Sequence, residues 1–198
     1  MSVNNTSLIL ENKNLSTFEI TENFTCIRFL NQNKERFELE FNLEKGTSFN
    51  TFLIISGDEL FIIHPPEKEY SKLINEVISN FFLQFKFKRI NIITGHVNPK
   101  IIETIKSISL KFSNLAITCS NPGSKLISEL WNQKNPKLET FIEQELPKIN
   151  IVKKELNLEL ENISLKLLPV PTARWPGGLI VYEENQEILL SEKIFSAH

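Results

Sequence analysis

The chain has 198 residues, 41% hydrophobic and 23% charged, which is ordinary for a globular domain with a substantial core. Its formal net charge of -2, with lysines scattered among glutamates, argues against a nucleic-acid-binding surface, and no apolar run approaches the ~20 residues of a membrane span. Cys26 and Cys119 lack the spacing of metal ligands and suit the core of a cytoplasmic protein without a signal peptide.

The first part of the chain predicts a tail and then antiparallel strands. Residues 1–20 are expected to form an extended tail, because the segment begins polar and aperiodic, and residues 21–198 to form one domain. Alternating or continuous apolar residues predict four strands, the last two joined by a Gly57-Asp58 hairpin turn: Phe24–Leu30, Arg36–Asn42, Thr51–Ser56 and Glu59–His64.

The middle of the chain alternates helical and strand patterns. Apolar residues at helical spacing alternate with short apolar runs, which predicts helix Glu67–Phe82, strand Ile90–Thr94, helix Lys100–Phe112, strand Ala116–Cys119 and helix Ser124–Trp131. Strands that alternate with helices indicate parallel pairing through crossovers.

After Ile149 the apolar period returns to two. Leucines alternate along residues 156–160 and 163–167, and a final hairpin is predicted from Leu179–Tyr182 and Glu187–Ser191. Antiparallel strands, then alternating strands and helices, then further antiparallel strands predict an α+β fold with two sheets and the helices outside.

The stretch Arg89–Lys100, RINIITGHVNPK, is the first candidate for a functional site. An apolar strand ends at Gly95, His96 follows, and Pro99 opens a helix. This arrangement mounts a side chain at the carboxyl edge of a sheet, where reactive groups are common. The alternative is structural: His96 closes the strand through a hydrogen bond.

Three stretches resemble the flavodiiron proteins, in particular the diflavin forms of cyanobacteria. Cys26–Ile54 resembles the segment that opens their metallo-β-lactamase-like domain, and HVNPK (His96–Lys100) falls at their His-x-Glu-x-Asp-His motif. Pro171–His198 is similar to their His-Trp-Pro-Asp segment and Cys-Asp-x-Phe-Gly-x-His ending. The resemblance extends in order from Thr21 to His198.

The resemblance implies an αββα sandwich that holds two irons and works with an FMN-bearing flavodoxin-like domain. The implied activity is reduction of dioxygen to water with electrons from NAD(P)H, an electron sink used in photoprotection. It also implies that this chain is truncated on the C-terminal side of the sandwich, because later strands, helices and another histidine ligand should follow His198. The FMN domain is not among these residues, so we expect the fragment alone to be inactive.

When the sequence is aligned with the family's motif, His96 occupies the first ligand position. Other residue types stand at the remaining ligand positions: Asn98 for Glu, Lys100 for Asp, Ile101 for His, Arg174 for His and Lys193 for the bridging Asp. Protonated ammonium and guanidinium groups cannot donate to iron, and each would repel a divalent ion by several kcal/mol at an effective dielectric of about 20. The resemblance therefore implies a cancelled di-iron site, that is, one whose ligand residues are replaced so that it binds no iron. Its cations would pair with carboxylates such as Glu192 or hold a small anion, chloride or phosphate.

Other arrangements remain open at this point. His64, His96 and His198 are the only histidines, and a rearranged metal site would need them to converge. Ser120–Ser124 precedes a helix and suits either a phosphate-binding N-terminus or simple N-capping.

Two classes of function follow. The first is an oxygen-reducing flavodiiron subunit with a degenerate site, which works in an oligomer beside a homologous subunit with intact ligands. The second is a non-catalytic assembly domain of the same fold. A metallo-hydrolase is a more distant alternative, because its zinc ligands are missing as well.

Overall fold

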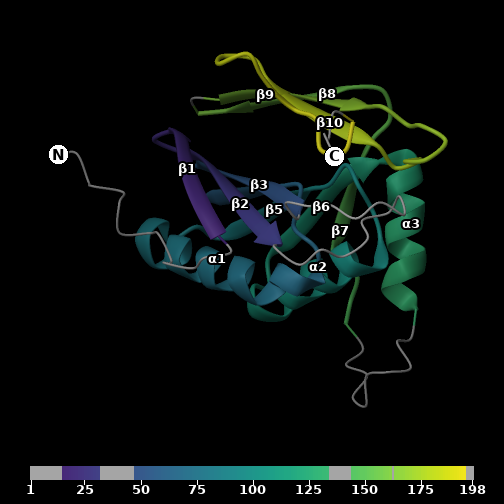
Figure 1. Ribbon diagram of the computed structural model, residues 1–198, viewed down its shortest axis with the longest axis horizontal. Helices are drawn as coiled ribbons and strands as arrows, with labels where there is room; N and C mark the ends of the chain where they lie inside the picture. The colour runs from purple at the N-terminus through teal and green to yellow at the C-terminus, as the bar shows by residue number, and fades with distance from the viewer. Residues whose placement is uncertain (1–14, 32–46, 134–143, 162, 195–198) are drawn as a thin grey trace.

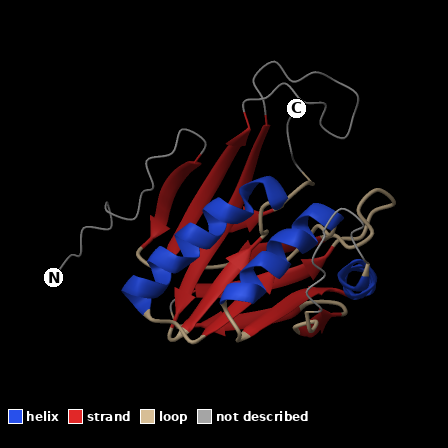
Figure 2. Ribbon diagram, turned by 90° about the horizontal axis from the view of Figure 1, so that it is seen from below, coloured by secondary structure: helices blue, strands red, loops and turns tan. Residues whose placement is uncertain are grey.

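The computed structural model describes residues 15–31, 47–133, 144–161 and 163–194. They form three layers: helices, a seven-stranded sheet and a four-stranded sheet, in that order (Figure 1). The helices are α1 (Ser71–Phe85), preceded by the 3-10 turn Lys68–Tyr70, α2 (Pro99–Lys111) and α3 (Asn121–Asn132). Figure 2 shows α1 and α2 side by side across one face of the larger sheet.

The seven strands of the larger sheet follow one another in chain order. They are β1 (Leu15–Thr21), β2 (Phe24–Asn31), β3 (Thr47–Ser56), β4 (Glu59–Ile63), β5 (Arg89–Ile93), β6 (Leu115–Ser120) and β7 (Lys148–Val152). The strands from β1 to β4 pair antiparallel, and those from β4 to β7 pair parallel. The predicted change from hairpins to parallel crossovers is therefore confirmed.

The four-stranded sheet has the order β11-β10-β9-β8 and is antiparallel throughout. Its strands are β8 (Leu156–Leu160), β9 (Ile163–Pro169), β10 (Leu179–Glu183) and β11 (Ile188–Leu190). One face packs against the larger sheet, and in the described part of the chain no helix covers the other (Figure 1). Three layers of the expected αββα sandwich are thus present in the described residues.

The predicted tail is wrong over residues 15–20. This segment forms β1, which pairs with β2 through a hairpin that turns at Glu22 and Asn23. The physical reason is edge pairing: the backbone of β1 bonds to β2 while Leu15 fits into the core at 6% exposure. The strand expected over Arg36–Asn42 lies outside the described residues.

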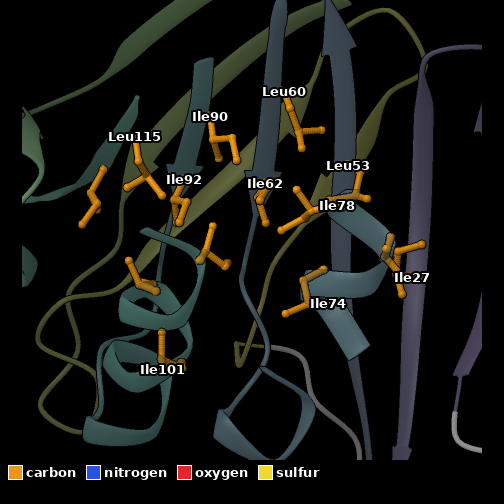
Figure 3. Packing of buried hydrophobic residues seen from close by; sticks show 14 of the residues in the cluster. Ile27, Leu53, Leu60, Ile62, Ile74, Ile78, Ile90, Ile92, Ile101 and Leu115 are labelled. Atoms are coloured by element: carbon orange, nitrogen blue, oxygen red, sulfur yellow. The ribbon is translucent and has the colours of Figure 1, made fainter. Parts of the chain in front are cut away.

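Two apolar clusters hold the layers together. The larger lies between the helices and the seven-stranded sheet, where isoleucines and leucines of the strands meet one face of α1 and α2 (Figure 3). The smaller lies between the two sheets. Cys26 and Cys119 are buried and unpaired, and burial raises the pKa of the Cys119 thiol to about 12, so it remains protonated and acts as a core residue.

Among the described residues, no helix has the length and apolar character that crossing a membrane requires.

Candidate functional site

His96 lies just beyond the carboxyl end of β5, where the two sheets approach each other. The connection to α2 is held by Thr94, whose hydroxyl donates to the His96 carbonyl at 2.7 Å. Gly95 is required there, because a Cβ atom on it would come within 2.0 Å of the Leu179 carbonyl oxygen on β10. The predicted position of His96 at a strand's carboxyl end is confirmed, and β10 of the other sheet presses against that end.

The His96 ring is buried, with 7% of the residue exposed. The Asn98 side-chain amide donates to His96 Nε2 at 3.2 Å, so this nitrogen accepts and the neutral ring carries its proton on Nδ1. Burial is the largest cause that lowers the pKa of His96 to about 4, and the charges of Lys193 and His64 act in the same direction. His96 is therefore a neutral imidazole at physiological pH.

His64, directly after β4, is the second buried imidazole of this region. Its backbone is left-handed, with φ of 56°, and its Nε2 donates to the Leu190 carbonyl on β11 at 3.2 Å. This bond ties the larger sheet to the smaller one. The Nδ1 atom is buried and has no hydrogen-bond partner among the described residues, and burial lowers the pKa of His64 to about 4.

Asn98 and Lys100, which stand at expected ligand positions, have structural partners. Asn98 caps α2, since its side-chain oxygen accepts from the Ile101 backbone N–H at 2.8 Å. Its amide group also donates to Glu67 at 3.1 Å. Lys100 pairs with Glu69 at 2.7 Å and Glu67 at 3.3 Å, and these carboxylates raise its pKa above the usual value.

The side chains at the other replaced positions also have neighbours. Ile101 is buried in the larger core cluster at 4% exposure. The Arg174 guanidinium lies 5.2 Å from the centre of the Trp175 ring, and the Lys193 ammonium lies 4.9 Å from that of Phe49. Lys193 is the cation whose charge acts on His96, whereas Lys100 interacts with the glutamates beside α2.

The donors of this region do not fit a pair of irons. A di-iron site needs several carboxylates with neutral imidazoles. Here the described residues place two neutral imidazoles, an amide and ammonium groups, and they contain no group of three or more His, Cys, Asp or Glu residues arranged to hold a metal ion. The Glu67 carboxylate contacts this group, and its oxygens already accept from Asn98 and Lys100.

The three-histidine alternative is only partly visible. His64 and His96 are near enough for the charge of one to affect the pKa of the other, while His198 lies outside the described residues. At Ser120–Ser124 the structure shows the N-capping alternative. Ser120 caps α3 by accepting from the Gly123 N–H at 3.2 Å and donates to the Gly177 carbonyl at 2.9 Å, so the Gly177 backbone packs over that helix end.

Two residues of the site were not predicted from sequence. Glu67 links Asn98 to Lys100, and Trp175 meets the His96 ring edge to face. A signal for Glu67 was present in the sequence, because it follows the two prolines after His64, at the same carboxyl edge as His96. Trp175 directly follows Arg174, which the family resemblance placed at the site, but no local pattern shows that its ring meets His96.

Comparison with known protein families and structures gives a consistent result. A family model described as ODP family beta lactamase matches residues 47–198. Diflavin flavoprotein A 5 of Nostoc sp. (strain PCC 7120) is 30% identical over 191 residues, and diflavin flavoprotein A 3 of Synechocystis sp. (strain PCC 6803) is 28% identical over 196. These matches cover 94% and 96% of this chain, which spans about 30% of the length of each relative.

Solved structures agree with the sequence matches. The metal-soaked Flv1 flavodiiron core from Synechocystis sp. PCC6803 superposes with a TM-score of 0.76 at 27% identity, covering 93% of this chain and 43% of that one. A crystallised fragment of diflavin flavoprotein A 5 from Nostoc sp. PCC 7120 gives a TM-score of 0.74 at 28% identity, covering 93% and 68%. The rubredoxin oxygen:oxidoreductase of Desulfovibrio gigas, at 15% identity and a TM-score of 0.71 over 88% of this chain and 40% of that one, shares the fold.

Proposed function

From the premise that the chain belongs to the ODP family of β-lactamase-like domains, in its flavodiiron branch, we propose that it serves a flavodiiron-type oxidoreductase as the subunit whose own di-iron site is cancelled. The single observation that carries this proposal is the Glu67–Asn98–Lys100 network. In it, an amide and an ammonium group stand at two ligand positions and are held there by carboxylates.

In this proposal the network stabilises the site without a metal. The Lys100 ammonium group pairs with Glu67 and Glu69, so these carboxylates already balance its positive charge. Asn98 is fixed by its cap on α2 and by its bond to Glu67. Bringing iron to these positions would require breaking the ion pair and the cap at the same time.

In this proposal the complete enzyme reduces dioxygen to water with electrons that pass from NAD(P)H through FMN. A homologous subunit with intact ligands carries out the oxygen chemistry, and this chain completes the oligomer. The FMN would be held by a flavodoxin-like domain, which this chain's residues do not provide. Iron is not assigned to this chain, because its donor set does not fit.

A non-catalytic assembly domain is the second candidate. The same substituted positions support it, because a domain that binds no iron retains a fold and a surface but no redox centre. The two candidates differ in their effect on the partner's turnover. The oxidoreductase subunit raises it, whereas the assembly domain joins the oligomer and leaves it unchanged.

Oxygen consumption by a reconstituted heteromer tests the proposal. The partner with intact ligands is assayed with NAD(P)H, alone and with the protein that contains this chain. The proposal predicts that turnover per intact site rises when the two proteins assemble. Assembly by sedimentation with unchanged turnover would favour the assembly domain, and absence of assembly would reject both candidates.

A further inference from the structure

The C-terminal ends of α1 and α2 carry exposed apolar side chains. Phe82, Leu83 and Leu110 are 43%, 76% and 59% exposed. Both helices cross back over parallel strands, so their C-terminal ends lie at the same edge of the sheet (Figure 2). This edge is opposite to the one that carries His96.

Phe82 belongs to an aromatic cluster that joins the two helix ends. Phe82 stacks edge to face on Phe87, with ring centroids 5.3 Å apart, and its ring lies 6.2 Å from that of Phe112. The rings of Phe87 and Phe112 are 6.3 Å apart, which joins the end of α1 to the end of α2. Such an aromatic cluster holds exposed apolar groups in place rather than leaving them to move freely.

The rim of this surface is positively charged. Lys86 and Lys111 directly precede Phe87 and Phe112 and are exposed. Within the described ranges no carboxylate forms an ion pair with either lysine. The neighbouring Lys88, in contrast, pairs with Asp58 at 2.9 Å.

We propose that this helix-end patch (Phe82, Leu83, Lys86, Leu110 and Lys111) docks an amphipathic segment of a partner protein that presents apolar side chains flanked by carboxylates. An apolar centre with a charged rim is the usual layout of a recognition surface. The two unpaired lysines select an acidic partner by charge complementarity. They also disfavour a second copy of this chain, because a symmetric contact would bring four ammonium groups together.

The inference is independent of the di-iron site. α2 has 13 residues, which corresponds to roughly 20 Å between its ends at about 1.5 Å per residue. A substitution in the helix-end patch therefore leaves the His96 region unchanged, and a failure here would not affect the proposed oxidoreductase role.

Binding of designed peptides to the full chain tests the inference. The probe is a labelled helical peptide with leucines on one face and glutamates on the rest, and its control replaces every glutamate by lysine. Fluorescence anisotropy is expected to show binding of the glutamate peptide only, weakened by added salt. Leu83→Ser is expected to weaken it about tenfold, and Lys111→Gln about threefold.

Two substitutions elsewhere act as controls. Lys72→Gln changes an exposed lysine of α1 away from its C-terminal end, and Leu189→Ser changes a 43% exposed leucine of β11. Both are expected to leave binding unchanged, and thermal unfolding establishes that all variants fold.

Several outcomes would overturn the inference. These are equal binding of both peptides, binding that survives Leu83→Ser, and a concentration-dependent dimer that this substitution abolishes. The last would identify a second copy as the occupant. Binding of phosphatidylserine vesicles that Leu83→Ser removes, without peptide binding, would instead identify a membrane surface.

Discussion

The rings of His96 and Trp175 meet edge to face, with centroids 4.5 Å apart and planes at 89° to each other. Trp175 comes from the loop before β10, while His96 follows β5, so the contact joins the ends of the two sheets. It covers the imidazole and contributes to the burial that lowers the pKa of His96 to about 4.

Removing the Trp175 ring should therefore raise the pKa of His96. Trp175→Ala is expected to move it towards the ordinary value of 6.5, because burial is the largest cause of the shift. Lys193→Gln should raise it less, since the Lys193 charge is a smaller cause. Titration of the imidazole carbon-bound proton by NMR measures both values. Equal shifts in the two variants, or none in Trp175→Ala, would contradict this account of the site.

The stability of the domain should fall as the pH drops from 6.5 towards 4. His64 and His96 have folded-state pKa values of about 4 against 6.5 for the free side chain, so in this range the unfolded chain binds more protons than the folded one. Each histidine contributes stability that is fully present above pH 6.5 and is lost by about 1.4 kcal/mol per pH unit below it. Urea unfolding between pH 6.5 and 5, where most carboxylates remain ionised, measures the slope.

The matched control for this prediction is His64→Asn. Asparagine tolerates the left-handed backbone at this position, so the substitution removes the titrating group with little added backbone strain. The slope should fall by about half, because one of two titrating groups is gone. A flat stability profile in the parent chain would show that neither imidazole is kept neutral by folding.

Gly95→Ala should be among the most damaging substitutions in the chain. The added methyl group would meet the Leu179 carbonyl oxygen at 2.0 Å, so β5 and β10 would have to separate. The expected cost is more than about 3 kcal/mol of unfolding free energy. Gly57→Ala, in an exposed turn with φ of 57°, meets only Glu161 at 3.6 Å and should cost about 1 kcal/mol. Chemical denaturation compares the two, and similar losses would contradict the close approach at Gly95.

The order of the elements could be predicted from sequence because it depends on local periodicity. The Gly57-Asp58 turn, the helical stripe of α1 and the alternating leucines of β8 and β9 are each visible within a few residues. β1 was missed because LSTFEIT gains its stability from pairing with β2, a partner that a local pattern does not reveal. Its seven residues also include few that are strongly buried.

The site was less predictable, because its geometry depends on residues far apart in the chain. His96 could be placed at a strand end from the Gly95 break and Pro99. The Lys100 pairing was expected to involve residues such as Glu192, whereas the structure pairs it with Glu67 and Glu69. Choosing between these carboxylates requires the packing of α2 against the turn before α1, which sequence periodicity does not contain.

Restoring iron donors should require several substitutions at once. Lys100→Asp alone should do little, because Ile101, Arg174 and Lys193 still stand where histidine and bridging carboxylate ligands are expected. The combined variant Asn98→Glu, Lys100→Asp, Ile101→His, Arg174→His and Lys193→Asp should gain iron affinity, tested in a protein that continues beyond His198. Iron titration followed by absorption spectroscopy measures the gain. Tight iron binding after Arg174→His alone would contradict the proposed origin of the cancelled site.

The iron content of the purified protein tests the central claim most directly. The chain is prepared in the presence of ferrous iron, treated with a mild chelator and analysed for iron and zinc, beside a flavodiiron core with intact ligands as the control. Because Asn98 and Lys100 are bonded to Glu67 where ligands are expected, the account predicts far less than two irons per chain while the control retains its metal. Stoichiometric iron or zinc in this chain would contradict it.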